Sequence, residues 1–343
     1  MERKVRVHAR SVDGLDGVKQ YNYTYEGSTH VGRTYKAICM YHGGCADGVG
    51  AAYVIHEHMT IMAREYGHAE ALYVPMQYST RNKQISQLRD AGLLSGEVFV
   101  VDFSITYENA ISLLDNGVNF ITVIDHHKSV AEELEKLRRL NEVTVVYASE
   151  NERSGAVLTY EYFFGDLKVP HALLAIEDRD LWKFNYPDTK AFVSGLFSHG
   201  LSIETVEMAC HANGFEQLVS DGEAIERAKA VNIDQSLGAD MYSVIEVRPP
   251  LSESHSATHY KVGLVNIPFY LASDTGHTLL ERRPDLDFVL LYSFNANEVR
   301  CSLRARKGGV DVSELAAFLG GGGHKEAAGF TMNGDDFYAM FLA

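Results

Sequence analysis

Between residues 36 and 200, short apolar runs alternate with segments whose apolar positions recur at helical spacing. Apolar runs rich in Val and Ile are typical of buried strands, and strands that alternate with helices predict a mostly parallel sheet covered on both faces. We therefore expect a doubly wound α/β domain over residues 36–200. Its predicted strands are 37–42, 72–74, 98–102, 121–125 and 143–147, and its predicted helices are 49–64, 106–116, 132–140, 155–164 and one from residue 171.

The pattern changes on either side of this domain. Residues 1–35 contain an alternating stretch, 21–25, which predicts an edge strand in an N-terminal β extension. Residues 203–236 have the pattern of two helices, so residues 201–239 are expected to form a helical linker. A smaller α/β domain is predicted over residues 240–343, with helices at 272–281 and 311–318, strands at 242–247 and 260–265, and a hairpin of strands 288–293 and 298–305.

The composition is that of a globular protein, with 343 residues of which 46% are hydrophobic and 22% charged. The sequence has no apolar run near the roughly 18 residues that cross a bilayer, no signal-peptide core at its start, and four cysteines without paired spacing. These features predict a cytoplasmic protein without a membrane partner. The net charge of -15 argues against binding to long duplex nucleic acid, but it allows a small anionic substrate where a metal supplies positive charge.

Residues that can hold a metal ion gather at the ends of the predicted strands. In parallel sheets, ligands bind beyond the carboxyl ends of the strands. Carboxylates gathered there repel one another unless cations compensate, and a mixed carboxylate and imidazole set suits Mn²⁺ better than Ca²⁺. Two ions about 3.5–4 Å apart, bridged by one carboxylate, would activate water and stabilise a phosphoryl transition state. The strand-end residues are His42, Asp47, Asp102, Asp125, His126 and His127.

Four consecutive glycines, at positions 320–323, precede His324 near the end of the chain. Glycine permits positive φ and close backbone approach, so the amide groups of such a segment can converge on a phosphate. A glycine run alone is more often a flexible turn. The histidine and the sequence Ala327-Ala328-Gly329 that follow it favour a substrate-binding loop.

Taken together, these motifs resemble the DHH phosphoesterase superfamily, whose members include RecJ-like and oligoribonuclease-like enzymes. Asp125-His126-His127, preceded by the strand-end residues described above, resembles the motif that gives the superfamily its name. The glycine-rich segment, with Ser302-Leu303-Arg304 one strand earlier, is similar to the associated DHHA1 domain. The resemblance covers roughly residues 36–343 and implies a DHH domain followed by a DHHA1 domain.

The resemblance implies a binuclear site with two Mn²⁺ ions per chain, or Mg²⁺ or another divalent ion in their place. In the first motif, which runs from His42 to Asp47, His42 and the acid position that Cys45 occupies here would hold one ion. Asp47, His126 and an acid of the fourth motif, near residue 178, would hold the other ion. Asp102 would bridge the two ions. The implied catalytic pair is Asp125 and His127.

Within that pair, His127 is expected to face the scissile phosphate or the attacking water. Asp125 is either a metal ligand or a group that orients an imidazole. The resemblance also assigns substrate binding to the smaller domain. There, Arg304 would make a bidentate contact with a phosphate, next to Gly321, Gly322, Gly323 and His324.

Two metal-site positions leave a choice. Cys45 stands where many relatives carry an aspartate, so it either binds a metal through its thiolate or fills a strand end without binding one. For the fourth-motif acid, the apolar residues Ala175 and Ile176 just before it favour Asp178, with Asp180 as the alternative.

The predicted function is metal-dependent hydrolysis of phosphodiester or phosphomonoester bonds in short oligonucleotides or small nucleotides, by an exonuclease-like enzyme in which two metals activate water. One alternative is an exopolyphosphatase or pyrophosphatase. Another is a non-catalytic nucleotide-binding protein whose first metal site is impaired at Cys45. The expected partner is a small phosphoester, and the sequence leaves open whether the chain forms a homodimer.

Overall fold

The computed structural model describes residues 5–25, 34–148, 152–211, 213–238, 241–247 and 259–342. The chain separates into two compact units, Met1–Glu226 and Arg227–Ala343. Each unit contains its own buried clusters of apolar side chains. The four-segment division expected from the sequence, with boundaries after residues 35, 200 and 239, stays a prediction.

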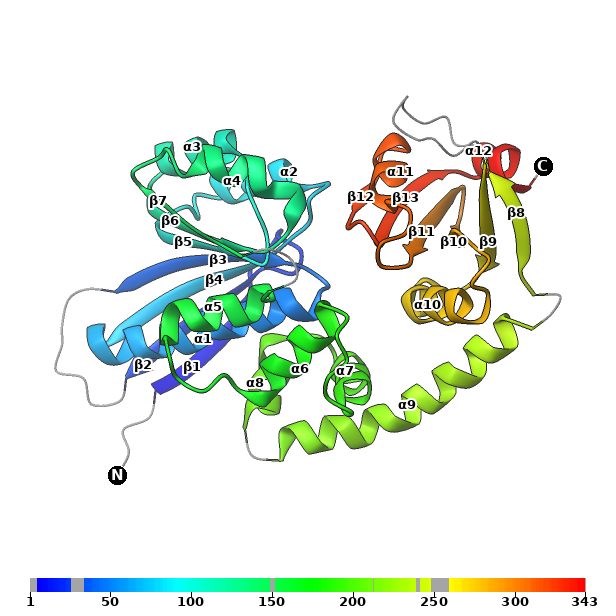
Figure 1. The fold of residues 1–343 in the computed structure, drawn as a ribbon. Helices are drawn as coiled ribbons and strands as arrows, with labels where there is room; N and C mark the ends of the chain where they lie inside the picture. The colour runs from blue at the N-terminus through cyan, green and yellow to red at the C-terminus, as the bar shows by residue number, and fades with distance from the viewer. Residues whose placement is uncertain are drawn as a thin grey trace. The chain divides into compact units, whose positions relative to one another are not determined.

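The first unit is built on a seven-stranded sheet with the strand order β1-β2-β4-β3-β5-β6-β7 (Figure 1). The five strands from β4 to β7 along this order are parallel, whereas β1 and β2 are antiparallel additions at one edge. The strands are β1 (Val5–Ser11), β2 (Lys19–Tyr25), β3 (Tyr35–His42), β4 (His68–Met76), β5 (Gly96–Val101), β6 (Val118–Asp125) and β7 (Val143–Tyr147).

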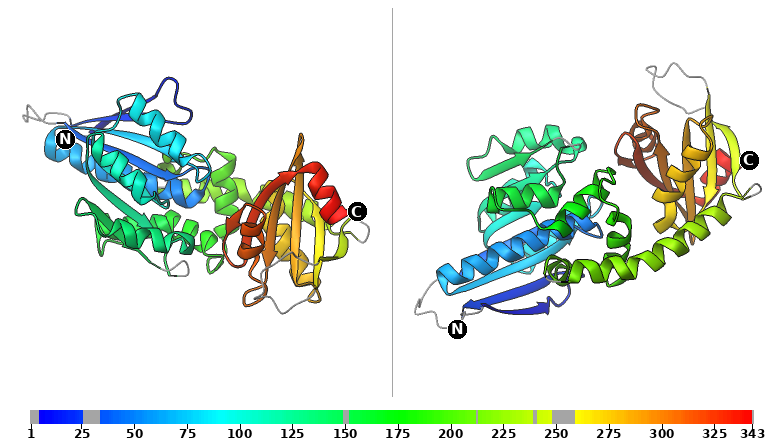
Figure 2. Two further views of the ribbon diagram at one scale, coloured as in Figure 1. Left: turned by 90° about the horizontal axis from the view of Figure 1, so that it is seen from above. Right: turned by 60° about the horizontal axis from the view of Figure 1, so that its bottom comes forward.

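Both faces of this sheet are covered by helices, which confirms the predicted doubly wound α/β fold (Figures 1 and 2). Alternate residues along a strand enter opposite cores. In β3, Cys39 joins the core beneath α1, and Ile38 and Met40 join the core on the other face. One face carries α1 (Ala46–Tyr66), α5 (Gly155–Phe164), α6 (His171–Asp180), α7 (Thr189–Ser198) and α8 (Ile203–Cys210), and the other carries α2 (Arg81–Asp90), α3 (Tyr107–Asp115) and α4 (Ala131–Leu137).

The chain order reverses between β3 and β5. From β3 the chain moves outward to β4, and it then returns to the other side of β3 to form β5, β6 and β7. Such a switch point leaves a crevice at the carboxyl ends of the two central strands, where doubly wound folds bind ligands. His42 ends β3, and Asp102 directly follows β5.

The N-terminal extension differs from its predicted form. The stretch 21–25 was expected to be an edge strand, but β2 lies between β1 and β4, and β1 forms the edge. The alternation in β2 arises because Tyr21 and Tyr23 are buried against α1, while the residues between them face the opposite side. β1 itself is largely exposed, so its sequence carries no burial pattern that predicts a strand.

The second unit contains a six-stranded sheet with the order β12-β13-β11-β10-β9-β8, which confirms a smaller C-terminal α/β domain. The predicted hairpin is present, since β10 and β11 pair antiparallel around Ala296 and Asn297. Helix α9 (Gly214–Ser236) spans the boundary between the two units. The other elements are β8 (Ser243–Val247), β9 (Tyr260–Asn266), α10 (Ala272–Arg282), β10 (Phe288–Asn295), β11 (Glu298–Ala305), α11 (Val312–Phe318), β12 (Gly322–Gly323), β13 (Ala327–Asn333) and α12 (Gly334–Phe337).

None of the helices among the described residues is both long and apolar enough to cross a membrane.

Candidate metal centre and active site

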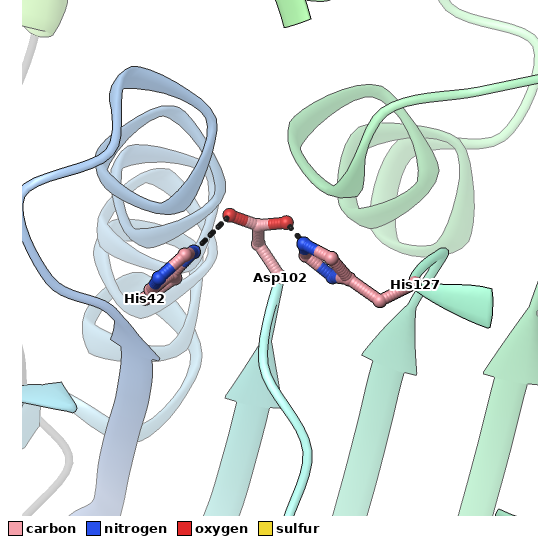
Figure 3. A group of neighbouring side chains, drawn as sticks. All are labelled: His42, Asp102 and His127. Carbon is pink, nitrogen blue, oxygen red and sulfur yellow. Dashed lines mark ion pairs between the residues drawn. The ribbon is translucent and has the colours of Figure 1, made fainter. Parts of the chain in front are cut away.

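Three neighbouring parallel strands deliver the side chains of the site. His42 is the last residue of β3, Asp102 follows β5, and His127 follows β6 after Asp125 and His126. Figure 3 shows His42 and His127 on either side of the Asp102 carboxylate, just beyond the ends of their strands. The Nδ1 atom of His42 lies 3.7 Å from Oδ2 of Asp102, and the Nδ1 atom of His127 lies 3.8 Å from Oδ1.

Two groups of potential metal ligands share Asp102. The first contains His42, Asp102 and His127, and the second contains Asp47, Asp102 and His126. Within each group, one ligand atom from every residue lies within 4.8 Å of the others. The structure thus brings together five residues predicted from the sequence and places the shared carboxylate between the two groups.

Asp102 adopts an unusual backbone conformation. Its φ is 50°, in the left-handed region that non-glycine residues seldom occupy, and its amide donates to the carbonyl of Ile124 on β6. The first residue of α5, Gly155, lies so close that a Cβ built on it would be 2.5 Å from the Cβ of Asp102. Only glycine allows α5 to approach the site in this way.

The N-terminus of α5 fixes Asp47. The amides of Gly155 and Ala156 donate to its two carboxylate oxygens at 2.6 Å and 3.0 Å. These are the first two amides of the helix, which have no partner within the helix. Asp47 is thereby held with Oδ2 at 3.7 Å from Nε2 of His126.

Asp125 orients its neighbours. One of its oxygens accepts hydrogen bonds from the backbone amides of His126 and His127 and, at 2.7 Å, from Nδ1 of the His127 ring. The other oxygen accepts a 2.6 Å hydrogen bond from the hydroxyl of Ser104. Because the carboxylate can only accept, the proton on the His127 ring is held at Nδ1, and Nε2 is left to face another partner.

Burial and charge act together on these groups. Burial, with the nearby charges of Asp102 and Asp180, raises the pKa of Asp47 well above its usual value. Burial lowers the pKa of His126, but the carboxylates of Asp102, Asp47 and Asp180 together outweigh burial and raise the pKa to about 10. The pKa of Asp102 is lowered, despite its burial, by the imidazoles of His126 and His42. The carboxylates therefore create a strong demand for positive charge.

Several buried polar atoms of the site lack a hydrogen-bond partner. They are Nδ1 of His42, both carboxylate oxygens of Asp102, and both ring nitrogens of His126. An unsatisfied buried polar atom is costly, and a group of them facing one another is typical of a metal site. Mixed nitrogen and oxygen donors at these separations fit a divalent metal.

The two aspartates proposed for the fourth motif have different surroundings. The oxygens of Asp178 accept hydrogen bonds from the amides of Asn185 and Tyr186 and from the hydroxyl of Thr189. Asp178 belongs to neither ligand group, so the sequence-based choice of this residue as a metal ligand receives no support from the geometry. Asp180 lies one helical half-turn further on, with Oδ2 at 3.6 Å from Nε2 of His126.

The turn that Asp178 holds is strained. The amide of Trp182 donates to the carbonyl of Arg179, and that of Lys183 donates to the carbonyl of Asp178, which closes α6 in a Schellman motif. Glycine is the usual residue at the left-handed position of this motif, but Trp182 occupies it with a φ of 54°. The Arg179 guanidinium lies 4.1 Å from the centre of the Trp182 ring and stabilises it there.

The residues predicted to bind substrate lie in the second unit. Gly322 and Gly323 form the short strand β12 beside β13, so this part of the glycine run is paired rather than free. A Cβ at Gly321 would lie 2.0 Å from the carbonyl oxygen of Gly329, which explains the need for glycine there. His324 exchanges backbone hydrogen bonds with Ala327 in the turn that follows. Arg304, on β11, donates to the hydroxyl of Ser273 at 2.7 Å.

Comparison with known proteins shows which proteins the chain resembles. The DHHA1 domain family matches residues 277–343. The chain is 28% identical to the uncharacterised protein R106 of Acanthamoeba polyphaga mimivirus, over 87% of this chain and 68% of that protein. It is 26% identical to oligoribonuclease NrnB of Bacillus subtilis (strain 168), over 81% of this chain and 68% of the relative.

Residues 277–343 thus match a DHHA1 domain, and the chain as a whole is similar to DHH/DHHA1 phosphoesterases.

Among solved structures, exonuclease RecJ bound to manganese superposes with a TM-score of 0.52 at 15% identity, covering 90% of this chain and 88% of RecJ. This likeness agrees with the DHH/DHHA1 fold. The DHHA1 match and the similarity to an oligoribonuclease support a phosphoesterase-like hydrolase.

Cys45 is the residue at which the chain departs from the pattern that its resemblance to the DHH superfamily implies. It precedes α1 as the N-cap residue, but its side chain does not cap the helix. Burial and the charges of Asp102 and Asp180 raise the pKa of its thiol, which disfavours the thiolate that a metal would need. Cys45 is absent from both ligand groups of the described residues, and metal binding by it stays a prediction.

Sequence reasoning missed the supporting residues of the DHH site. Ser104 holds Asp125, and the amides of Gly155 and Ala156 hold Asp47. Neither role has a local signal, because Gly155 lies 108 positions from Asp47 and meets it only through the fold. The only hint in the sequence concerned the fourth-motif acid, for which the closely spaced Asp178 and Asp180 were both candidates.

Proposed function

We propose that the chain hydrolyses phosphodiester or phosphomonoester bonds of short oligonucleotides or small nucleotides. The observation that carries this proposal is the pair of ligand groups that share Asp102, because a carboxylate between two ions is the arrangement that serves phosphoryl transfer. The likeness to oligoribonuclease NrnB supports a short nucleic-acid substrate. The net charge of -15 is consistent with small substrates rather than long duplexes.

Two divalent ions, Mn²⁺ in preference to Mg²⁺, would bind to the two groups. His42, Asp102 and His127 would hold one ion, and Asp47, Asp102 and His126 would hold the other, with Asp180 near enough to contribute. When bound, such ions lower the pKa of water and offset charge on the phosphoryl oxygens. The role of the protein itself is to fix the ligands in place, and the ions would offset the mutual repulsion of the carboxylates.

Asp125 has a positioning role in this scheme. Its carboxylate keeps the Nδ1 proton of His127 in place, so the Nε2 lone pair points away from Asp125 and can face an ion or accept a hydrogen bond from the attacking water. This modifies the sequence-based interpretation, in which Asp125 was a direct ligand or an orienting group. His127 also lies at ligand distance in the group with His42, so binding an ion is added to its expected contact with substrate.

Substrate binding is proposed for Arg304, Gly321, Gly322, Gly323 and His324 of the DHHA1 domain. The guanidinium of Arg304 can pair with a phosphate through two parallel hydrogen bonds. The glycine segment is exposed, and it has no side chains that would hinder the approach of a phosphate. These residues would determine which phosphoesters bind, whereas the DHH domain would carry out the hydrolysis.

A panel of substrates tests the proposal. The metal-loaded protein should hydrolyse dinucleotides and short oligonucleotides faster than cyclic dinucleotides, adenosine bisphosphate or inorganic polyphosphate at equal concentration. Asp102→Ala should abolish this activity and leave the circular dichroism spectrum unchanged. Fewer than two ions per chain, together with no hydrolysis of any nucleotide or generic phosphodiester, would overturn the proposal in favour of a binding protein. Release of orthophosphate from polyphosphate alone would replace it with a polyphosphatase.

A further inference from the structure

An exposed tyrosine ring lies next to the candidate metal centre. Tyr78 follows β4, and 39% of its surface is exposed. The centre of its ring is 5.8 Å from the centre of the His42 ring and 6.4 Å from that of His127. Both histidines belong to the first ligand group, together with Asp102. The ring is therefore part of the surroundings of whatever binds at this group.

The Tyr78 ring is supported from within the protein. The fully buried ring of Phe103, next to Asp102, lies 4.2 Å away at an interplanar angle of 32°. The guanidinium of Arg81 is 5.9 Å from the ring centre, and it is itself held by a 3.0 Å hydrogen bond to the carbonyl of Ser104. These contacts give the ring a fixed position beside the ligand group.

The loop that carries Tyr78 is also fixed. The side-chain amide of Gln77 donates to the carbonyl of Gly43, and the amide of Gly43 donates to the carbonyl of Met76. Gln84 closes the loop from α2, since its side chain donates to the carbonyl of Pro75 and accepts from the amide of Gln77. The loop is thus joined to the turn that follows His42. A ring on such a loop is held in place before any ligand arrives.

A rigid aromatic ring with an exposed surface suits a flat aromatic partner. Stacking of a nucleobase on an aromatic side chain tolerates any base, because every base presents a π-face. In a nucleotide, a single ribose separates the base from its phosphate. The base of a nucleotide whose phosphate binds beside His42 and His127 can therefore reach Tyr78. Inorganic polyphosphate has no group that could use this ring.

We propose that Tyr78 is a specificity-determining residue that stacks on the nucleobase attached to the bound phosphate. This inference rests on the proposed function and makes it more specific, because it assigns the preference for nucleotides over inorganic phosphates to one ring of the DHH unit. Stacking of this kind does not depend on hydrogen bonds to the edges of the base. Tyr78 would therefore favour a ligand with any base over a ligand without one.

Equilibrium binding tests the proposal. Adenosine 5′-monophosphate and ribose 5-phosphate are titrated into the Mn²⁺-loaded full-length protein, and the ratio of their dissociation constants is compared between variants. Wild-type protein should bind adenosine 5′-monophosphate at least about fivefold more tightly. Tyr78→Phe, which keeps the ring, should retain this ratio. Tyr78→Leu should reduce it to near one without weakening ribose 5-phosphate. Tyr162→Leu, which alters an exposed tyrosine on α5, is the matched control and should leave the ratio unchanged.

Three results would overturn the inference. They are a wild-type ratio of one, a Tyr78→Leu ratio equal to that of the wild type, or equal weakening of both ligands in a Tyr78→Leu protein whose circular dichroism matches the wild type. Hydrolysis of dinucleotides by the wild type is measured alongside. Its absence would count against the proposed function, whereas its presence with an unaltered binding ratio in Tyr78→Leu would count against the role of Tyr78 alone.

Discussion

Asp178 and Asp180 lie on the same helix, two positions apart, yet their carboxylates have different environments. Asp178 is buried and accepts two hydrogen bonds from the segment after α6 and one from the first residue of α7. Asp180 is partly exposed and faces His126. Because successive helical positions differ by about 100° around the axis, two positions suffice to change which neighbours a side chain meets. Substituting each residue separately should distinguish their roles.

Asp178→Ala should lower the free energy of unfolding of the metal-free protein by about 2–4 kcal/mol, because it leaves buried donors without their charged acceptor. Asp180→Ala should leave that free energy nearly unchanged, since it removes one of several repelling carboxylates. It should instead weaken Mn²⁺ binding roughly tenfold or more. Urea denaturation and calorimetric titration measure the two quantities. A stable Asp178→Ala protein that has lost a metal ion would restore Asp178 as a ligand.

At the residue scale, the sequence was sufficient where chemistry and strand ends coincide. His42, Asp47, Asp102, His126 and His127 were predicted as neighbours because parallel strands end at a common edge, and the structure does gather them. What the sequence could not provide was orientation. The choice between Asp178 and Asp180 depends on how α6 is rotated against the sheet, and that rotation follows from packing rather than from local pattern.

At the element scale, the approach of α5 to the sheet matters most for the site. Its first two amides hold Asp47, and its first residue touches Asp102. Ser154 caps the helix by accepting a hydrogen bond from the amide of Val157, so the helix begins at the residue that the site requires. The position of α5 therefore couples both ligand groups.

Gly155→Ala should separate α5 from Asp102, since the added methyl group would overlap the Asp102 Cβ. We expect hydrolysis to fall on the order of 100-fold, because a shift of about 1 Å in a reacting group has that effect. Gly238→Ala is the control, because a Cβ there meets no atom closer than 3.3 Å. Steady-state kinetics on a dinucleotide measures both variants. Full activity of Gly155→Ala would contradict the proposed tight approach.

A second prediction concerns the contact between β2 and α1. His56 of α1 is buried, its Nδ1 atom lies 2.8 Å from the hydroxyl of Tyr23, and that hydroxyl lies 3.0 Å from the hydroxyl of Tyr73. Burial lowers the pKa of His56 to about 4, below the value near 6.5 of an unfolded chain. Between these two values the unfolded chain binds a proton that the folded chain does not.

Stability from His56 is consequently complete above about pH 6.5 and is lost as the pH falls toward 4, by about 3 kcal/mol in total. His56→Gln, which cannot titrate, should lack this part of the pH dependence. The test is the difference in unfolding free energy between the two proteins, measured by urea denaturation at pH 7 and pH 4.5. A difference that does not change with pH would show that His56 is not buried as a neutral group.

Other elements show why sequence patterns succeed or fail. Strands β5 and β6 were predicted because both faces of their C-terminal halves are largely buried, which makes those halves mainly apolar. The helices α2 and α7 were missed. Only Ile85 and Leu88 of α2 are buried, too few for a clear apolar stripe. The N-terminal strand β1 has no buried residue and depends on β2 for its place in the sheet.

At the scale of the whole molecule, the two units have separate cores. The apolar clusters beneath the large sheet involve residues up to position 219, and those of the smaller sheet begin at position 233. The core of one unit can therefore be disrupted without exposing the core of the other unit. All proposed metal ligands belong to the first unit, so an ion bound to the folded state stabilises that unit by mass action.

Addition of Mn²⁺ should raise the Tm of the first unit by several degrees and leave that of the second unit unchanged. At a hundredfold excess over the dissociation constant, the expected stabilisation is about 2.7 kcal/mol. Differential scanning calorimetry with and without EDTA measures the effect, and Asp102→Ala should abolish it. An equal shift of both transitions in the wild type, or a persistent shift in Asp102→Ala, would argue against two ions centred on Asp102.

The two ligand groups that share Asp102 are assembled from strands that are distant in sequence, and this has a consequence for folding. His42, Asp102 and His126 are contributed by β3, β5 and the end of β6, and Asp47 is fixed only after α5 has docked. No fragment that ends before residue 156 contains the whole arrangement, so a nascent chain has no complete ion site until most of the sheet has formed. Metal binding can therefore report the last steps of folding of this unit, because partly folded intermediates lack the complete site and would not be stabilised by the ions.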